Sequence, residues 1–145
     1  MRMREALAGA LAAFALNWAW ENAQAPLYRG YTGFADHVWT CTVATFGDVL
    51  IVALIFCVVA VAWRDPEWHH RASPARYAVA VAAGIVIAIA IESWALTTGR
   101  WLYGAMPLIP YTDVGLVPIL QMILIPSLVF VLMRHSAATD QDTDR

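Results

Sequence analysis

The chain has 145 residues, of which 61% are hydrophobic and 14% are charged, and its formal net charge is -2. This composition is typical of a membrane protein and excludes an ordinary soluble domain. The chain also lacks the strongly basic patch of a nucleic-acid-binding protein. Its length matches a single domain, so we expect one domain whose main partner is the lipid bilayer.

Apolar stretches predict four membrane-spanning helices, because a span needs about 20 mostly apolar residues. They cover residues 5–25, 42–63, 76–96 and 114–133. The predicted fold is therefore an all-α membrane protein with one four-helix transmembrane domain over residues 1–135. A disordered, acidic tail is expected over 136–145. Pro118 and Pro126 should bend the fourth helix and free backbone carbonyls near the bend.

The first apolar segment also resembles a secretory signal peptide, because Ala23, Gln24 and Ala25 look like a cleavage site. Two neighbouring residues argue against cleavage. Glu21 lies just before the site, and Pro26 would follow the cut, where proline is unfavourable. We therefore interpret this segment as a helix that is retained in the protein.

The distribution of arginine predicts the orientation, since cytoplasmic loops of membrane proteins are enriched in basic residues. With the N-terminus inside, the cytoplasmic side holds Arg2, Arg4, Arg64, Arg71, Arg76 and Arg134. The outer loops hold only Arg29 and Arg100. This bias predicts a multi-pass protein of the inner, cytoplasmic membrane with both termini in the cytoplasm. His69 and His70, within RDPEWHHR, are interpreted as an exposed cytoplasmic turn.

Polar side chains should gather at one depth of this bundle, near its outer face. They are Asn17, Glu21 and Gln24 of the first helix, Asp48 of the second, Glu92 of the third and Gln121 of the fourth. At 1.5 Å per residue, antiparallel helices place the three acids and Gln121 about 8–10 Å below the outer boundary. Gly84 and Ala88 share a face with Glu92, and small residues let helices approach closely in lipid. The helices should therefore pack tightly at one end and open into a polar pocket at the other.

Acidic residues inside membrane spans are costly and usually mark function. Glu92, Glu21 and Asp48 are therefore the candidate catalytic residues. Burial and mutual repulsion should leave at least one of them protonated at neutral pH, which makes a general acid possible. The alternative is a polar clamp, in which the acids accept hydrogen bonds from neighbouring amides and only lock the bundle.

Side chains around the acids are candidates for substrate binding. They are Asn17, Gln24, Gln121, Trp101, Tyr103 and Arg100. The three amides could orient the acids, and the aromatic residues of the outer loops could form a lid that stabilises a cation. The same aromatic residues could instead be an interfacial belt. Arg29 or Arg100 could pair with the acids or hold an anionic head group.

The positions of the histidines argue against a cofactor or a metal in the predicted pocket. All four histidines lie in predicted loops or at helix ends, so a bis-histidine haem in mid-membrane is not expected. His37 could join the three acids around a divalent ion, but the spacing matches no recognised metal motif. We therefore predict neither a cofactor nor a metal site.

The stretch ESWALTTGRWLYGAMPLIP, which starts at Glu92, combines an acid near a helix end with a Gly-x-Trp-x-Tyr loop and following prolines. It resembles a pattern in membrane-embedded carotenoid enzymes of the lycopene-cyclase and carotenoid-hydratase types. The resemblance implies that Glu92 is the acid and that Trp101 and Tyr103 are pocket walls. It covers about a tenth of the chain, and the Pro-x-Glu-Glu type of motif found in the cyclases is absent.

The leading functional hypothesis is an intramembrane enzyme that acts by acid–base chemistry on a polyisoprenoid or another apolar lipid, as a cyclase, hydratase or isomerase does. Two alternatives remain open. One is an accessory or assembly subunit of a larger membrane complex, with the polar layer as a docking lock. The other is a proton-coupled carrier of a small molecule, which could form a homo-oligomer.

Overall fold

The computed structural model describes residues 3–143, with side chains described for residues 3–135. Its helices are α1 (Met3–Gln24), α2 (Phe34–Trp63), α3 (Pro74–Thr97) and α4 (Leu116–Thr143), with the 3-10 turn η1 (Ala25–Leu27) after α1. The predicted all-helical fold with four long helices is confirmed. The tail predicted for 136–145 falls on residues whose side chains lie outside this description, and it stays a prediction.

Three of the helices are long and apolar enough to cross a membrane: α2, α3 and residues Leu116–His135 of α4. Helix α1 is not one of them, although its 22 residues are enough in length. Polar residues such as Asn17 and Glu21 interrupt its apolar run. The architecture is thus that of a helical membrane protein, and the span by α1 remains a prediction.

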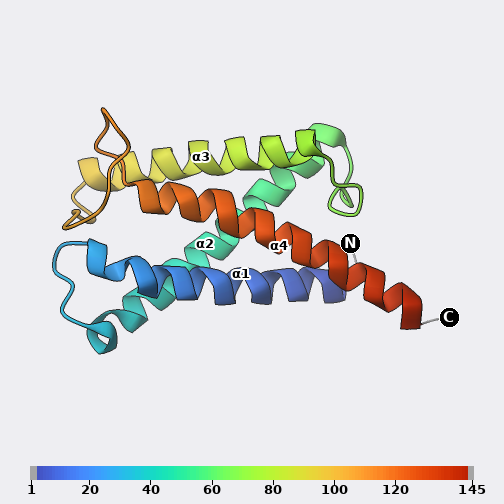
Figure 1. Ribbon diagram of the computed structural model, residues 1–145, viewed down its shortest axis with the longest axis horizontal. Helices are drawn as coiled ribbons and strands as arrows, with labels where there is room; N and C mark the ends of the chain where they lie inside the picture. The colour runs from blue at the N-terminus through green and yellow to red at the C-terminus, as the bar shows by residue number, and fades with distance from the viewer. Residues whose placement is uncertain (1–2, 144–145) are drawn as a thin grey trace.

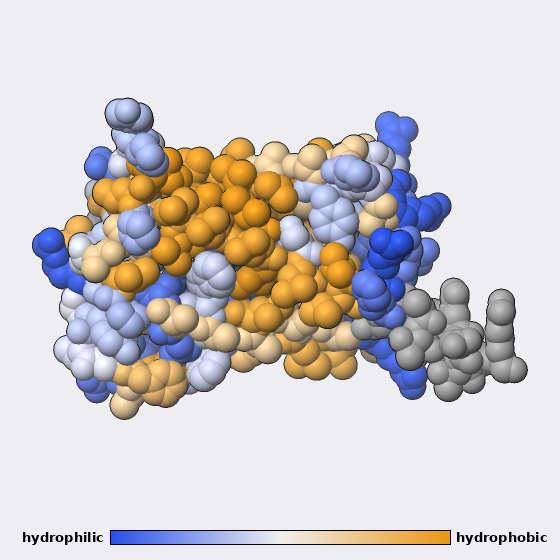
Figure 2. All heavy atoms as spheres, viewed as in Figure 1, coloured by the Kyte–Doolittle hydropathy of each residue, from blue (hydrophilic) through white to orange (hydrophobic). Residues whose placement is uncertain are grey.

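Successive helices lie antiparallel in a four-membered ring (Figure 1). Helix α1 packs on α2 and α4, and α3 packs on α4 and α2. The connections 25–33 and 98–115 lie together at one end, here called the paired-loop end. The connection 64–73 and both ends of the described chain lie at the other, the α2–α3 end. Figure 2 shows hydrophobic side chains across the middle of one face and hydrophilic ones at both ends, as a membrane-spanning bundle requires.

Helix α2 begins at Phe34 rather than at residue 42, so the predicted start was too late. Gly33, with φ 153°, has a non-helical backbone conformation, so the helix can begin only after it. From Phe34 the helix runs without interruption to Trp63. At 30 residues, α2 is about 45 Å long, which exceeds the roughly 30 Å hydrocarbon core. Its first turns therefore extend beyond the level of the acids.

The buried faces of α1 and α3 are built mainly from small residues spaced about four apart. They are Gly9, Ala13 and Asn17 in α1, and Ala80, Gly84, Ala88, Glu92 and Ala95 in α3. This spacing keeps side chains on one face of a helix. The prediction that Gly84, Ala88 and Glu92 share a face is confirmed. Small side chains bring the helix backbones close, and Asn17 and Glu92 lie in the half of each row nearer the paired-loop end.

The connection 64–73 does not form the exposed turn that we predicted. Trp68 is fully buried, and its indole N–H donates to the carbonyl of Phe56 at 3.2 Å. Its ring also packs against Phe130 of α4 at a centroid distance of 5.1 Å. Because Trp68 folds back into the bundle, it carries His69 with it, and His69 is 0% exposed.

The two prolines of α4 differ in their effect. Pro118 is in the first turn of the helix, where backbone N–H groups lack an intrahelical acceptor anyway, so the predicted interruption there is wrong. Pro126 lies inside α4. A proline cannot donate to the carbonyl four residues earlier, so the carbonyl of Met122 has no backbone N–H partner of the regular helical kind. The predicted freeing of a carbonyl therefore applies to Pro126 and not to Pro118.

Candidate functional site

A cavity of about 610 Å³ opens at the paired-loop end, between the helices. Its lining includes seven of the nine residues proposed from the sequence: Glu21, Gln24, Asp48, Glu92, Arg100, Trp101 and Gln121. Tyr103 and Asn17 are not part of the lining, but each is hydrogen-bonded to a residue that is. The rest of the wall is largely apolar, with Ile51, Ala88 and Ile91 among its members. Such a mixture is typical of a small-molecule site.

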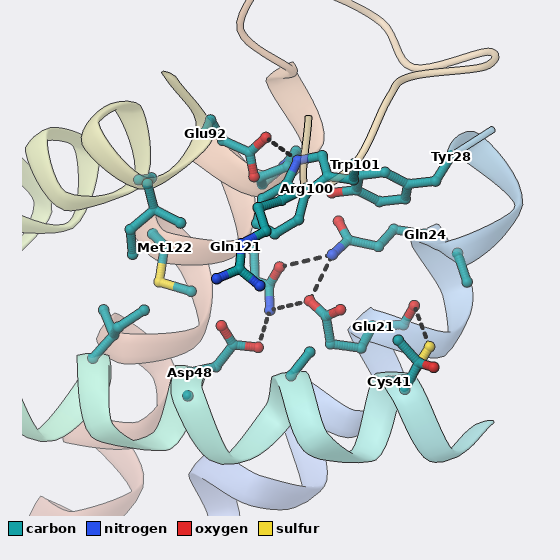
Figure 3. A pocket seen from close by; sticks show the side chains of 18 of the residues that line it. Glu21, Gln24, Tyr28, Cys41, Asp48, Glu92, Arg100, Trp101, Gln121 and Met122 are labelled. Carbon is teal, nitrogen blue, oxygen red and sulfur yellow. Dashed lines mark hydrogen bonds between the residues drawn. The ribbon is translucent and has the colours of Figure 1, made fainter. Parts of the chain in front are cut away.

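Gln121 is at the centre of one group of polar side chains (Figure 3). Its amide nitrogen lies 3.1 Å from Glu21 Oε1, 3.1 Å from Asp48 Oδ2 and 2.9 Å from Asn17 Oδ1. Gln121 is 1% exposed, so these contacts are made away from bulk water. A single amide of α4 thus joins side chains of α1 and α2, as the polar-layer hypothesis predicts.

Gln24 completes this group from the end of α1. Its amide nitrogen lies 2.6 Å from Glu21 Oε1 and 3.2 Å from Gln121 Oε1. The two amide groups carry four N–H hydrogens, one fewer than the five acceptor contacts that they make. One of these hydrogens is therefore shared between two acceptors. Glu21 and Asp48 therefore both accept from the amide of Gln121.

Glu92 lies in a second group of hydrogen bonds, separate from that of Gln121. Its Oε2 accepts from the indole N–H of Trp101 at 3.1 Å and from the hydroxyl of Tyr103. The Tyr103 oxygen in turn accepts from the backbone N–H of Gly115 at 2.9 Å. A Cβ on Gly115 would lie only 2.9 Å from that oxygen, so a glycine is needed there. The three acids therefore line one cavity, but only Glu21 and Asp48 share a donor.

Backbone pairing between the two loops holds the aromatic residues over Glu92. The N–H of Gly104 donates to the carbonyl of Leu27 at 2.9 Å, and that of Arg29 donates to Leu102 at 2.9 Å. The Tyr28 ring consequently lies 6.3 Å from the Trp101 ring, in an edge-to-face arrangement. Aromatic residues thus form a cover on the cavity. Sequence reasoning does not single out Tyr28 among the loop aromatics, because the pairing that places it joins distant segments.

The arginines do not pair with the acids of the cavity. Within residues 3–135, no arginine lies at ion-pair distance from Glu21, Asp48 or Glu92. Arg100 lines the cavity and its guanidinium lies 5.1 Å from the centroid of the Trp94 ring. That stacking is a cation–π contact. The suggestion that Arg29 or Arg100 neutralises an acid is therefore wrong for this structure.

The tyrosine that supports Glu92 should make stability depend on alkaline pH. Burial raises the pKa of the Tyr103 hydroxyl above its ordinary value, and the hydrogen bond to Glu92 acts in the same direction. Above about pH 10 an unfolded tyrosine releases its proton, whereas folded Tyr103 keeps it, so folding stability should be present below that pH and decrease above it. We expect the thermal midpoint of Tyr103→Phe to fall less steeply above about pH 10 than that of the wild type. Equal slopes would contradict this assignment.

The fold and the cavity define a helical bundle of the membrane-protein class, with carboxyl groups and amides buried at one end. Comparison with protein-family models, with curated proteins and with solved structures yields no match. The resemblance of the segment from Glu92 to Tyr103 to carotenoid enzymes therefore stays a prediction. The local geometry must support any functional conclusion.

Proposed function

We propose that the protein is an intramembrane acid–base enzyme that acts on an apolar lipid of the polyisoprenoid type, with Glu92 as the proton donor. The observation that carries the proposal is the form of the cavity. It is large enough for part of a lipid chain, its wall is mostly apolar, and three carboxyl groups line it. We further infer that all four helices cross the cytoplasmic membrane, with both termini inside, so that the cavity lies near the outer face.

The hydrogen bonds of Glu92 favour it as the donor. Both of its donors, Trp101 and Tyr103, reach Oε2, while Oε1 has no partner among the described residues. Oε1 is thus the oxygen that can carry a proton toward the cavity. Transfer of this proton to a carbon–carbon double bond leaves a Glu92 carboxylate and a carbocation on the lipid. The hydrogen bonds from Trp101 and Tyr103 then stabilise the carboxylate that forms.

The second group of acids can complete the reaction. The cation loses a neighbouring proton to the Glu21–Asp48 pair, which yields an isomerised or cyclised alkene. Alternatively, water adds to the cation and its surplus proton goes to that pair, which yields an alcohol. Buried Gln24 Oε1 has no hydrogen-bond partner, and it can accept from such a water or hydroxyl. The ring faces of Trp101 and Tyr28 can stabilise the cation in between.

Deuterium incorporation tests this proposal without knowledge of the product. The whole protein is placed in lipid nanodiscs in heavy water with acyclic polyisoprenoids of several chain lengths. We expect the wild type to introduce deuterium into at least one of them, as measured by mass spectrometry. Glu92→Gln should reduce the rate by about 100-fold or more, since general acid catalysis contributes about 10²–10⁴-fold. Asp113→Asn, which changes an exposed loop acid, should leave the rate unchanged.

A negative result and two further measurements separate the alternatives. No deuterium uptake by a folded, monodisperse wild type would overturn the enzymatic proposal. A stoichiometric protein partner in gentle purification would then favour the assembly-subunit hypothesis. Proton release upon addition of a small cation, abolished by Glu21→Gln, would favour the carrier hypothesis instead.

A further inference from the structure

A second cluster of ionisable side chains lies at the α2–α3 end, far from the cavity. It consists of Glu5 in the first turn of α1 and the adjacent His69 and His70 of the connection 64–73. One ligand atom from each residue can be chosen so that all three lie within 4.8 Å of one another. Glu5 and Glu21 are sixteen positions apart on one helix, which is about 24 Å. The cluster is therefore independent of the proposed active site.

The separations within this cluster match the edge lengths of a metal coordination sphere. Glu5 Oε2 lies 3.7 Å from His69 Nε2 and 3.4 Å from His70 Nε2. Two ligand atoms at about 2.1 Å from a tetrahedral zinc ion lie about 3.4 Å apart. An ordinary N–H···O hydrogen bond is about 2.9–3.0 Å long, so the His69 contact is too long for one. The two imidazoles thus converge on one carboxylate oxygen at a distance that an ion would bridge.

His69 supplies an independent indication of a ligand. Its side chain is 0% exposed, and neither of its ring nitrogens has a hydrogen-bond partner. A buried polar group without a partner costs about 1–3 kcal/mol, and coordination of an ion by a ring nitrogen would offset that cost.

Ring packing holds the cluster in place, and two nearby arginines are paired with a carboxylate outside the cluster. The His69 ring packs against Phe56 at a centroid distance of 5.4 Å and lies 4.0 Å from the His70 ring. Arg71 and Arg76 each lie 3.2 Å from an oxygen of Asp65. These two cations of the same end of the bundle are therefore paired with another carboxylate. His70 is 29% exposed, which gives an ion a route into the cluster.

We propose that Glu5, His69 and His70 form a binding site for a borderline divalent transition-metal ion, of the type of Zn²⁺. Imidazole nitrogen and carboxylate oxygen are preferred ligands of this class, whereas Mg²⁺ and Ca²⁺ prefer oxygen alone. Three protein ligands leave a fourth position for water. The ion joins the start of α1 to the connection between α2 and α3, so binding stabilises this end of the bundle.

Zinc titration of the chelator-treated full-length protein in detergent tests the site. We expect the wild type to bind one Zn²⁺ per chain and to give a cobalt-substituted form with visible absorption of tetrahedral type. Glu5→Gln and His70→Asn should each weaken zinc binding by about tenfold or more, because even outer-shell changes cost about 10–100-fold. These two residues are chosen because His69 is part of the packed core and its replacement can impair folding. His135→Gln, which alters an exposed histidine of α4, should bind zinc like the wild type.

The cavity acids provide the decisive comparison, because carboxyl groups near His37 could also attract zinc. Loss of zinc binding in Asp48→Asn but not in Glu5→Gln would overturn the proposal. Equal zinc binding by the wild type and the Glu5→Gln/His70→Asn double variant would overturn it as well. Zinc should also raise the thermal midpoint of the wild type and leave that of the folded double variant unchanged. This readout does not depend on any enzymatic activity.

Discussion

Replacement of Gly84 by alanine should destabilise the bundle by about 2–3 kcal/mol, as expected when a well-packed interface is overfilled. A Cβ at this position would lie 2.4 Å from the backbone oxygen of Met122 and 3.2 Å from its carbonyl carbon. A backbone group of α4 cannot rotate away as a side chain can. Helices α3 and α4 must therefore separate or shift to admit one methyl group. The drop should be measurable as a lower midpoint in thermal or denaturant unfolding in detergent.

Pro126 explains why the contact at Gly84 is so close. The carbonyl of Met122 would normally accept from the backbone N–H of residue 126, which proline lacks. In a membrane bundle, an unpartnered carbonyl cannot be left facing lipid. The glycine lets α3 cover that oxygen, in the type of close approach at which Cα–H···O contacts occur. Gly84 and Pro126, distant in the sequence, thus both favour the close approach of α3 to the Met122 carbonyl of α4.

Gly9→Ala is the matched control for this prediction. Its added Cβ would lie 2.7 Å from Met133 Sδ, and the thioether is the flexible end of an adaptable side chain. We expect a cost below about 1 kcal/mol, since Met133 can move and alanine favours the helix by a similar amount. An equal loss of stability in both variants would show that the backbone contact at Gly84 is not the cause.

The helical architecture could be predicted from the sequence because it depends on local patterns. The apolar stretches of α2 and α3 are long enough to span a membrane in any context, and small residues at four-residue spacing identify the buried face of α3. Polar residues among apolar ones stand out for the same reason, so the lining by Glu21, Asp48 and Glu92 was predictable. The start of α2 could not be predicted in this way. Its first turns, before residue 42, lie outside the apolar stretch, and hydropathy does not detect them.

The division of the acids into two groups depends on rotamers and loop pairing, which no sequence pattern carries. The resemblance of the stretch after Glu92 implied Tyr103 as a pocket wall, but it did not predict that the Tyr103 hydroxyl donates to Glu92 itself. The burial of His69 could not be predicted for a related reason. RDPEWHHR has the polarity of an exposed turn, and only the fold-back of Trp68 against Phe130 reverses that expectation. Glu5 carries no signal of its own, because an acid in the first turn of a helix is ordinary.

Replacement of Gln121 by leucine should cost more than any other substitution in the cavity. Leucine keeps much of the side-chain volume but removes the amide that donates hydrogen bonds to Asn17, Glu21 and Asp48. Each buried acceptor without a donor costs about 1–3 kcal/mol, and more when it is charged. We expect the free energy of unfolding to fall by about 3–5 kcal/mol, because three buried acceptors lose a donor. Much of the protein should fail to stay monodisperse in detergent.

Asn22→Leu provides the comparison for Gln121→Leu. The Asn22 amide donates to the carbonyl of Trp18, one turn earlier in the same helix, at 2.8 Å. That carbonyl belongs to a regular helix, so the loss should be below about 1 kcal/mol. A similar effect of the two substitutions would mean that the loss of an amide as such, rather than the position of Gln121 among the acids, causes the destabilisation.

A double-mutant cycle identifies which interaction Gln121 provides. If the cost of Gln121→Leu comes from acids left without a donor, neutralising them beforehand should remove part of it. In the Glu21→Gln/Asp48→Asn background, the added Gln121→Leu substitution should therefore cost at least about 1 kcal/mol less than in the wild type, as for residues in one hydrogen-bond network. An unchanged cost in that background would instead assign the effect to packing. The contribution of Glu21 and Asp48 to stability would then be independent of Gln121.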